Sequence, residues 1–465
     1  MNPAALVRLL ATRTAHGARL AWTADELDAY RHRALGVLRA HAYARSPFYR
    51  RFHRGLERAP LNELPVLNKS LLMERFDEVV VDRRVRMAHV ERYLEGALAT
   101  DRFLGRYRVA ATGGTTGRRG IFLAGPSEWN AILASYSRAY AWAGLPVGLS
   151  HSLRMAIVSS TAPTHQSSIV GATVRNPLVP TLRLNAADPL AVTVAALNHF
   201  RPQALIGYAS ILGELAAEQH AGRLRIDPRA VFSASEVLTP EIREAASAAW
   251  RSDPFNVYAA TETAGIASEC QQHHLHLFAD LVIIESVDED NRPVPNGRTG
   301  TKLLVTVLFS RSQPLIRYEL TDRVQLGIQP ATDLGPFTTV VAAIEGRSED
   351  VLVLPGADGA EVRVHPNLFH AVLEPMNAPW QVIRESDAIR VLVAGSVPVA
   401  DLERDLIRRL AAAGVRLPRL SVVQVSTIPR TALGKAPLVR VQGVADEMDP
   451  SKVEPALRAA APMAS

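Results

Sequence analysis

The sequence contains a single cysteine, Cys270, among 465 residues. An intramolecular disulfide is therefore excluded, and because the composition fits a reducing compartment we expect a cytoplasmic protein. No apolar run reaches the ~20 residues that a membrane-spanning helix needs, so no membrane partner is expected. Arginine supplies almost all of the positive charge, since the only lysines are Lys69, Lys302, Lys435 and Lys452. A lysine beside a glycine in a turn, as at Lys435, is therefore a candidate for a specific role.

Charge and length exclude further classes of protein. The net charge of +6 is scattered along the chain, and no block of Lys and Arg alternates with aromatic residues, so we expect no nucleic-acid partner. The length of 465 residues exceeds the roughly 250–300 residues at which a single core stops growing, which predicts two or more domains. The first 24 residues hold three arginines and no acidic residue, but no cleavage signature follows, so no targeting segment is expected.

The middle of the chain alternates between strand and helix patterns, which predicts βαβ units and a largely parallel sheet. The expected strands are 154–160, 203–208 and 230–235, and the expected helices are 24–44, 128–142, 189–200, 209–220 and 239–250. After Trp250 the sequence becomes rich in antiparallel strand patterns, and the last hundred residues read strand–helix–strand. We predict an α/β fold with a large N-terminal domain over 1–348, which includes an antiparallel β subdomain, and a small α+β domain over 349–465.

A glycine-rich stretch, "ATGGTTGRRG" at 111–120, is the first candidate site. Gly113, Gly114 and Gly117 make it too flexible for the interior of a helix or strand. Its backbone amides can converge on phosphate oxygens, and its threonine hydroxyls add donors. It matches neither the P-loop pattern nor G-x-G-x-x-G. Taken alone, it fits a flexible surface turn equally well.

Two carboxylates follow strand-like runs further along the chain. In "VYAATETAG", at 257–265, Tyr258 can stack on a base and Glu262 can hold a hard cation such as Mg²⁺ through oxygen. In "QPLIRYELTDRVQL", at 313–326, Asp322 can accept two ribose hydroxyls. Taken alone, neither carboxylate requires a ligand. Glu262, for example, also fits an exposed position at the end of a strand.

Two more segments complete the set, "IEGRSEDVLVLPG" at 344–356 and "PRTALGKAPLVR" at 429–440. Taken in order, the five motifs resemble those of the ANL superfamily of adenylate-forming enzymes, and most of all its phenylacetate–coenzyme A ligase branch. The resemblance extends from about residue 30 to 440. It includes "SPFYRRF", "LPVLNKSLL", "GYAS" and "SASEVLTPEIRE".

The resemblance implies a role for individual residues. The family's phosphate loop falls on Thr112, Gly113, Gly114, Thr115, Thr116 and Gly117. Its adenine-binding residue pair falls on Ser235 and Glu236. Its aromatic motif falls on Tyr258, Ala259 and Thr261, and the Mg²⁺ ligand of that motif falls on Glu262. Its ribose-binding aspartate falls on Asp322 and its Gly-Arg step on Arg347. Its hinge falls on Glu349, and its catalytic lysine, carried by a mobile C-terminal domain, falls on Lys435.

The same resemblance implies the reaction. A carboxylic acid and ATP give an acyl-adenylate and pyrophosphate, with Lys435, Glu262 and Thr115 as catalytic residues, and a thiol such as coenzyme A then displaces AMP. The implied acid is small and aromatic or heteroaromatic, and its candidate contacts are His165, Tyr208 and Ser235. A carrier-protein phosphopantetheine, an amine acceptor, activation of nitrite and a non-catalytic nucleotide-binding protein are the alternatives. A homodimer is left open.

Three features depart from the family pattern. Gly113 stands where the family has a second hydroxyl residue, and Glu349 replaces an aspartate at the hinge. Relatives often hold zinc between a Cys/His segment and a later cysteine-rich turn, but the later turn here, 329–337, has no cysteine. Because a structural zinc ion normally has four ligands, zinc is not expected. We interpret the segment as a solvated turn, with metal binding as the alternative, and its residues are Cys270, His273, His274 and His276.

Overall fold

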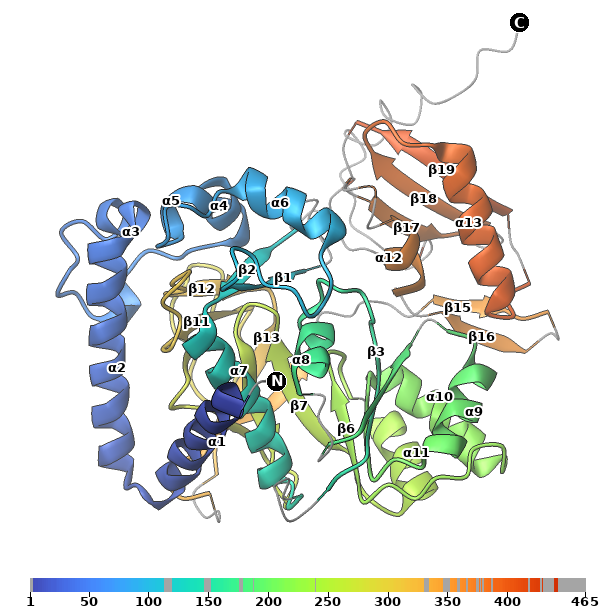
Figure 1. Cartoon of the computed structure of the whole chain (residues 1–465), viewed down its shortest axis with the longest axis horizontal. Coiled ribbons are helices and arrows are strands. Elements are labelled where there is room, and N and C mark those ends of the chain that lie inside the picture. Colours follow the sequence, from blue (N-terminus) through green and yellow to red (C-terminus); the bar gives the residue numbers. More distant parts are fainter. Residues whose placement is uncertain are drawn as a thin grey trace, which may run out of the picture. The chain divides into compact units, whose positions relative to one another are not determined.

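The computed structural model describes most of the chain as two compact units (Figure 1). The described residues are 3–112, 119–145, 152–174, 179–186, 188–238, 240–329, 334–345, 352–357, 360–364, 367–373, 376, 378, 380–385, 388–416, 419–426, 429 and 439–441. The first unit extends to residue 347 except for 112–120 and 186–192, which group with the second unit from 348 onward. That residues 349–465 move as a domain stays a prediction.

Six α-helices of 4 to 22 residues form the described start of the first unit. They are α1 Pro3–Ala18, α2 Ala24–Arg45, α3 Pro47–Phe52, α4 Lys69–Glu74, α5 Phe76–Val79 and α6 Met87–Gly96. The helix expected over 24–44 is confirmed, and it begins with a capping box in which Thr23 and Glu26 satisfy each other's backbone amides. The amide of Leu71 donates to the side chain of Asn68 at 2.9 Å, which fixes the start of α4. No helix in the described ranges is both long and apolar enough to cross a membrane.

A nine-stranded sheet forms the centre of this unit, in the order β13-β14-β9-β8-β7-β6-β5-β3-β4. The strands are β3 Met155–Ser159, β4 Thr181–Asn185, β5 Ala204–Gly207, β6 Ala230–Ala234, β7 Phe255–Ala260, β8 Ala264–Glu269, β9 Leu275–Leu277, β13 Arg323–Ile328 and β14 Thr339–Glu345. Neighbours from β4 to β7 are parallel, and the remaining pairs are antiparallel. The predicted α/β fold with a parallel sheet is therefore confirmed.

Helices connect the parallel strands, as the alternating pattern predicts. They are α8 Gln166–Val174, α9 Leu190–Phe200, α10 Ala209–His220 and α11 Pro240–Trp250, and a further helix, α7 Pro126–Trp142, precedes β3. In Figure 1, α10 and α11 lie side by side. α7 packs against β8. Every residue of β3 is buried, whereas the edge strand β4 is partly exposed throughout. The sequence predicted neither β4 nor α8.

Two smaller sheets accompany the large one in the first unit. β1 Arg108–Ala111 and β2 Ile121–Ala124 form an antiparallel pair. β10 Val282–Val287, β11 Lys302–Val307 and β12 Tyr318–Leu320 form a three-stranded antiparallel sheet. The predicted antiparallel β subdomain is therefore present.

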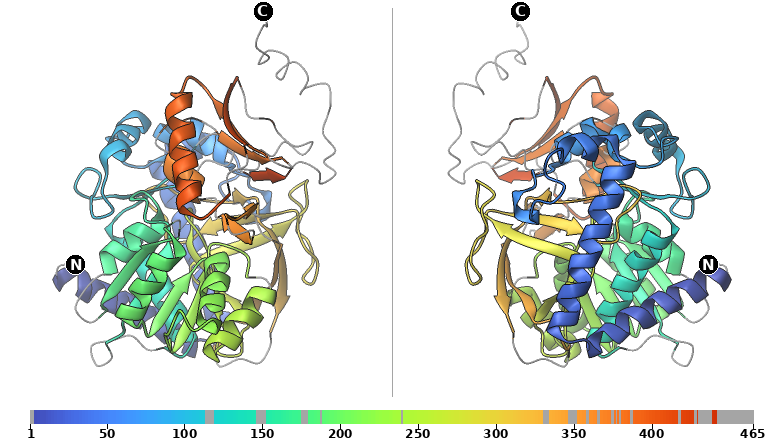
Figure 2. Two further views of the ribbon diagram at one scale, coloured as in Figure 1. Left: turned by 90° about the vertical axis from the view of Figure 1, so that its right-hand side faces the viewer. Right: turned by 90° about the vertical axis from the view of Figure 1, so that its left-hand side faces the viewer.

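The second unit has its own core. Its strands are β15 Leu352–Pro355, β16 Glu361–Val364, β17 Trp380–Arg384, β18 Ala388–Ala394, β19 Arg419–Val425 and β20 Val439–Val441, and its helices are α12 Asn367–Leu373 and α13 Val399–Ala412. The four-stranded sheet has the order β19-β18-β17-β20. Leu402, Leu406 and Leu410 recur every four residues on α13 and are buried with the sheet's valines. Figure 2 shows α13 along this sheet.

Candidate functional site

Candidate residues gather at one edge of the parallel part of the large sheet. Ser160 follows β3, Tyr208 follows β5, Ser235 follows β6 and Thr261 follows β7. These four strands are parallel neighbours. The carboxyl ends of parallel strands meet at the same edge, which is the usual place for a ligand in an α/β sheet. The structure therefore brings the predicted adenine, metal and acyl residues to one side of the sheet.

Two positions at this edge have unusual backbone conformations. Ser235 has φ of 70° and Ala264, at the start of β8, has φ of 62°. Non-glycine residues rarely adopt positive φ, and such strain concentrates at ligand sites. The strained turn at Ser235 also sets the direction in which Glu236 leaves the strand. The local backbone is therefore consistent with the adenine-binding role that the sequence predicts for these two residues.

Tyr258 and Asp322 form a buried hydrogen-bonded pair. The Tyr258 hydroxyl donates to Asp322 Oδ2 at 2.7 Å. The exposed fractions are 9% for Tyr258 and 7% for Asp322. The pair links β7 to the connection between β12 and β13. The sequence predicts separate roles for the two residues, so this coupling is new, and it orients the carboxylate predicted to hold ribose.

Glu262 lies in the turn that connects β7 and β8, next to Ala259 and Thr261. The amide of Thr263 donates to the Ala260 carbonyl at 3.2 Å and closes this turn. Glu262 is half-buried, and none of the ion pairs between described residues includes it. A carboxylate oxygen is the kind of ligand through which Mg²⁺ is bound. The residues present at this turn thus fit the implied ion.

The described ends of the glycine-rich stretch form the base of a hairpin loop. β1 and β2 pair antiparallel through Ala111 and Ile121. Beyond them, the amide of Thr112 donates to the Gly120 carbonyl at 2.9 Å, and the amide of Gly120 donates to Thr112 Oγ1 at 2.9 Å. The Thr112 hydroxyl, predicted to face phosphate, therefore accepts a hydrogen bond within this base.

The loop between β3 and α8 supplies the predicted acyl contact His165. The amide of Ser160 donates to the Tyr208 hydroxyl at 2.8 Å, which joins the ends of β3 and β5. Arg183, on β4, donates to the carbonyls of Ser160 at 2.9 Å and Ser167 at 2.6 Å. Sequence reasoning missed Arg183. A signal was available, since it is the one charged residue in a short apolar stretch.

Gln166 connects the acyl side of the site to the metal side. The Tyr136 hydroxyl, from α7, donates to Gln166 Oε1 at 2.9 Å, and Gln166 Nε2 donates to the Thr261 carbonyl at 3.2 Å. Sequence reasoning missed both side chains, because no local pattern relates positions on α7, α8 and the β7–β8 turn. This chain of hydrogen bonds holds the backbone beside Glu262.

The Cys/His segment is not the solvated turn that the sequence predicts. Cys270 is 2% exposed and His276 is fully buried. One ligand atom each from Cys270, His274 and His276 lies within 4.8 Å of the others. Burial lowers the pKa of His276, and its Nδ1 lies 2.7 Å from the Phe337 carbonyl. His276 Nε2 and His274 Nδ1 are buried without a hydrogen-bond partner among the described residues.

These three residues fit three positions of a zinc site, and a carbonyl on the far nitrogen of a histidine is the usual support for a ligand. Residues 330–333, where a further ligand would fall, lie outside the described ranges. The premise of a solvated turn is wrong, and the expectation that zinc is absent stays a prediction.

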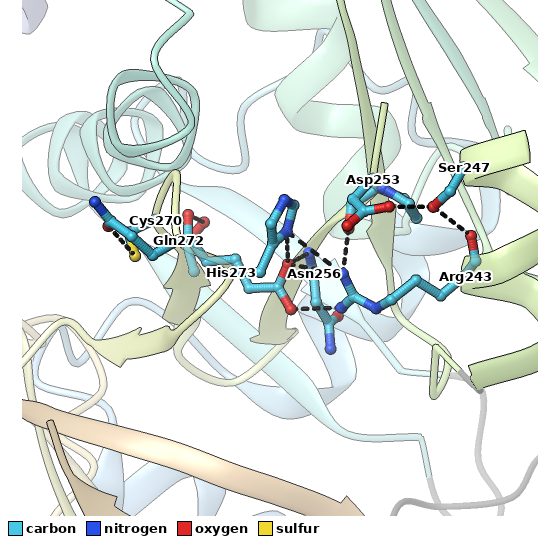
Figure 3. A network of polar contacts seen from close by, with 10 residues as sticks. Arg243, Ser247, Asp253, Asn256, Cys270, Gln272 and His273 are labelled. Carbon is cyan, nitrogen blue, oxygen red and sulfur yellow. Dashed lines mark hydrogen bonds and ion pairs between the residues drawn. The ribbon is translucent and has the colours of Figure 1, made fainter. Parts of the chain in front are cut away.

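His273 points elsewhere, into a polar network that joins α11 to the sheet (Figure 3). Its Nδ1 lies 2.9 Å from Glu269 Oε2, and Arg243 Nη2 donates to Glu269 Oε1 at 2.6 Å. The amide of Asn256 also donates to this carboxylate, at 3.0 Å. The buried charge of Glu269 is therefore compensated from three elements, which explains why His273 does not join Cys270.

Other predicted site residues lie outside the described ranges and stay predictions. They are Gly113, Gly114, Thr115, Thr116, Gly117, Arg347, Glu349 and Lys435.

Comparison with known proteins gives a distant relative and a shared fold. No family model matches the sequence. Protein CapK of Staphylococcus aureus is 21% identical over 301 residues, which are 63% of this chain and only 60% of that protein. The crystal structure of 2-hydroxyisobutyryl-CoA ligase with 2-HIB-AMP and CoA in the thioesterification state has a TM-score of 0.62 at 19% identity, over 91% of this chain and 92% of that one. Its open conformation has a TM-score of 0.56 at 19% identity, over 89% and 90%.

Proposed function

We propose that this chain, which has the fold of the ANL superfamily of adenylate-forming enzymes, activates a small carboxylic acid with ATP and transfers the acyl group to a thiol. In the first half-reaction a carboxylate oxygen attacks the α-phosphorus, forms the acyl-adenylate and releases pyrophosphate. In the second, a thiolate attacks the acyl carbon and AMP leaves. Coenzyme A is the proposed thiol, since the ligase with the same fold was crystallised with CoA.

The buried Tyr258–Asp322 pair at the carboxyl edge of the sheet carries this proposal. Ribose has two adjacent hydroxyls that donate, and a carboxylate held by a 2.7 Å hydrogen bond is oriented before the ligand arrives. Preorganisation of this kind lowers the entropy lost on binding. Ser235 and Glu236 lie at the same edge, where the adenine is proposed to bind.

Glu262 would hold Mg²⁺, and the ion would supply positive charge to the phosphates as pyrophosphate leaves. The Gln166 hydrogen bond to the Thr261 carbonyl fixes the backbone next to this carboxylate. The backbone of a metal ligand has to be fixed, because Mg²⁺ requires strict coordination geometry and a small displacement of the carboxylate lowers the affinity for the ion. Lys435 and Thr115 are proposed to stabilise charge at the attacking oxygen and the phosphates, and a rotation about Glu349 would remove Lys435 before thiol transfer.

The acyl group is proposed to lie among His165, Tyr208 and Ser235. Arg183 uses its guanidinium on the carbonyls of Ser160 and Ser167, so it shapes the loop that carries His165. The resemblance to the phenylacetate–coenzyme A ligase branch supports an aromatic or heteroaromatic acid.

Pyrophosphate release with a panel of acids tests the proposal. Aromatic, heteroaromatic and short aliphatic acids are each incubated with ATP and Mg²⁺, with and without coenzyme A, and acyl-CoA is measured separately. We expect acid-dependent release with at least one aromatic acid and thioester only when coenzyme A is present. Release without any thioester would replace coenzyme A by another acceptor, and no acid-dependent release would contradict adenylation itself. Lys435→Ala is the matched inactive control.

A further inference from the structure

The connection between β3 and α8, residues 160–165, is largely buried although it is a loop. Polar side chains in it and beside it are each 5–7% exposed, and they are Ser159, Ser160, Thr164, Gln166 and Ser168. Loops usually lie at the surface, because buried backbone groups need hydrogen-bond partners. The partners of this loop therefore show which parts of the molecule hold it in place.

Three parts of the candidate site are joined to the loop by hydrogen bonds. The amide of Ala111, at the base of the glycine-rich stretch, donates to the Thr164 carbonyl at 2.9 Å. The amide of Ser160 donates to the Tyr208 hydroxyl at 2.8 Å. Gln166, directly after the loop, donates to the backbone of the β7–β8 turn at 3.2 Å. The loop thus contacts the predicted phosphate, acyl and metal parts of the site together.

Arg183, on β4, holds this segment at two points. Its Nη2 donates to the Ser160 carbonyl at 2.9 Å, and its Nη1 donates to the Ser167 carbonyl at 2.6 Å. These acceptors are neutral, and none of the ion pairs between described residues includes Arg183. Burial lowers the pKa of this guanidinium. Because burial of a charge without a counter-charge is costly, the arginine is better explained by the geometry it imposes than by a gain in stability.

Gly171, on α8, gives Arg183 the space for these hydrogen bonds. A Cβ added at Gly171 would lie 2.9 Å from Cδ and 3.1 Å from Cζ of Arg183, and it would overlap Nη1. Glycine in the interior of a helix is unfavourable relative to alanine, but it allows a close approach. The overlapping atoms belong to a flexible side chain, so alanine at this position should displace the guanidinium and leave the backbone in place.

We propose that Arg183 is a positioning residue for formation of the acyl-adenylate, and that it requires Gly171 to reach its acceptors. This inference rests on the proposed function. Arg183 acts through the carbonyls of Ser160 and Ser167, which fix the loop that carries His165. A shift of this loop would move the acid relative to the α-phosphorus of ATP, and a misplacement of about 1 Å can cost about 10²-fold in rate.

A double-mutant cycle tests the pair. Pyrophosphate release is measured with Mg²⁺, ATP and the acid of the panel that gives the fastest release. We expect Arg183→Met and Gly171→Ala each to lower kcat by about 10–100-fold. The double variant should be no slower than Arg183→Met, because alanine at 171 then has no guanidinium to displace. Losses that multiply in the double variant, or an unchanged kcat in Gly171→Ala, would overturn the proposal.

Gly213→Ala is the matched control for Gly171→Ala. Gly213 also lies in the interior of a helix beside the parallel strands, on α10. A Cβ added there meets Ile242 at 3.5 Å, which is an ordinary contact. We expect Gly213→Ala to keep the full rate. A loss equal to that of Gly171→Ala would assign the effect to any helical glycine and would contradict the role of Arg183.

Calorimetric titration of AMP separates positioning from misfolding. AMP is proposed to be held by Tyr258 and Asp322, which lie outside the loop, so its affinity and the number of binding sites should be unchanged in every variant. A loss of AMP sites as large as the loss of rate would indicate unfolded protein and would overturn the proposal. Absence of acid-dependent pyrophosphate release from the unchanged protein would overturn the proposed function and this inference together.

Arg183→Lys separates geometry from charge. Lysine keeps the positive charge, but it has a single ammonium group where arginine has two nitrogens that reach two carbonyls. We therefore expect the rate of Arg183→Lys to stay well below that of the unchanged protein. The full rate in Arg183→Lys would show that charge alone is sufficient and would overturn the proposal.

Discussion

Replacing Asp322 with alanine is expected to remove most of the affinity for ATP and to leave the chain folded. Two hydrogen bonds between ribose hydroxyls and the carboxylate would be lost, each worth about 1.5–3 kcal/mol, so the affinity should fall by a factor of roughly 10²–10⁴. The chain should stay folded, since the strands on either side of Asp322 are paired through backbone hydrogen bonds.

The buried pair adds an effect on folding that can be separated from binding. Asp322→Ala leaves the Tyr258 hydroxyl without this acceptor in a position that is 9% exposed, which should cost about 1–3 kcal/mol of unfolding free energy. Tyr258→Phe removes the donor and keeps the carboxylate, so it should lower stability by a similar amount with a much smaller loss of ATP affinity. The double variant should be more stable than the sum of the single effects predicts, because each single substitution already removes the hydrogen bond between the two side chains.

Calorimetric titration of ATP without acid measures the first quantity, and urea denaturation measures the second. Asp290→Ala is the matched control, since Asp290 is an exposed aspartate whose side chain is 67% accessible, and it should change neither quantity. Unchanged ATP affinity in Asp322→Ala would refute the ribose assignment. Additive stability losses in the double variant would refute the coupling between Tyr258 and Asp322.

Three further outcomes are expected. Lys435→Ala should lower adenylation about 10²–10³-fold, as measured by pyrophosphate exchange, and leave thiol transfer from supplied acyl-adenylate intact; full exchange would contradict its role. The pKa of His16 is lowered from 6.5 in the unfolded chain to about 3, so the unfolded state binds the extra proton, and stability should fall as the pH drops from 6.5 towards 3. At pH 5 the loss should be about 2 kcal/mol, and urea denaturation of His16→Phe should show a flatter pH profile; an unchanged profile would count against this. Zinc tests the expectation that none is bound: the melting temperature should be the same with and without the ion, and a rise in the unchanged protein that Cys270→Ser abolishes would contradict this.

Elements with a clear periodic pattern could be predicted from the sequence. The spacing of Leu402, Leu406 and Leu410 marks α13, and the alternation of apolar runs with helical patterns marks the parallel strands. α8 could not be predicted, because "QSSIVGATV" is rich in small and β-branched residues and shows no helical period. β4 is an edge strand of intermediate burial, so its sequence lacks the continuous apolar run of its neighbours.

The candidate site also contains features that the sequence predicts and features that it does not. Motifs located Tyr258 and Asp322 individually, but their hydrogen bond joins positions 64 residues apart, and nothing in the local sequence indicates it. The turn containing Cys270 was misjudged because histidine-rich composition suggests exposure. Its burial depends on long-range packing, in which Trp142 and Phe337 from distant segments lie against His276 and each other.

The order of strands in the large sheet has a consequence for how this chain folds while it is being synthesised. β3 pairs with both β4 and β5, and β5 is synthesised only after α9. Each parallel pair can therefore form only after the whole helical connection between its two strands has been synthesised. Asp322, which accepts the hydrogen bond from the Tyr258 hydroxyl, leaves the ribosome later than the whole parallel region. A nucleotide bound through Asp322, as proposed, therefore cannot assist the early folding of β3 to β7. That region must become stable through its own buried core while the carboxyl edge of its strands is still incomplete.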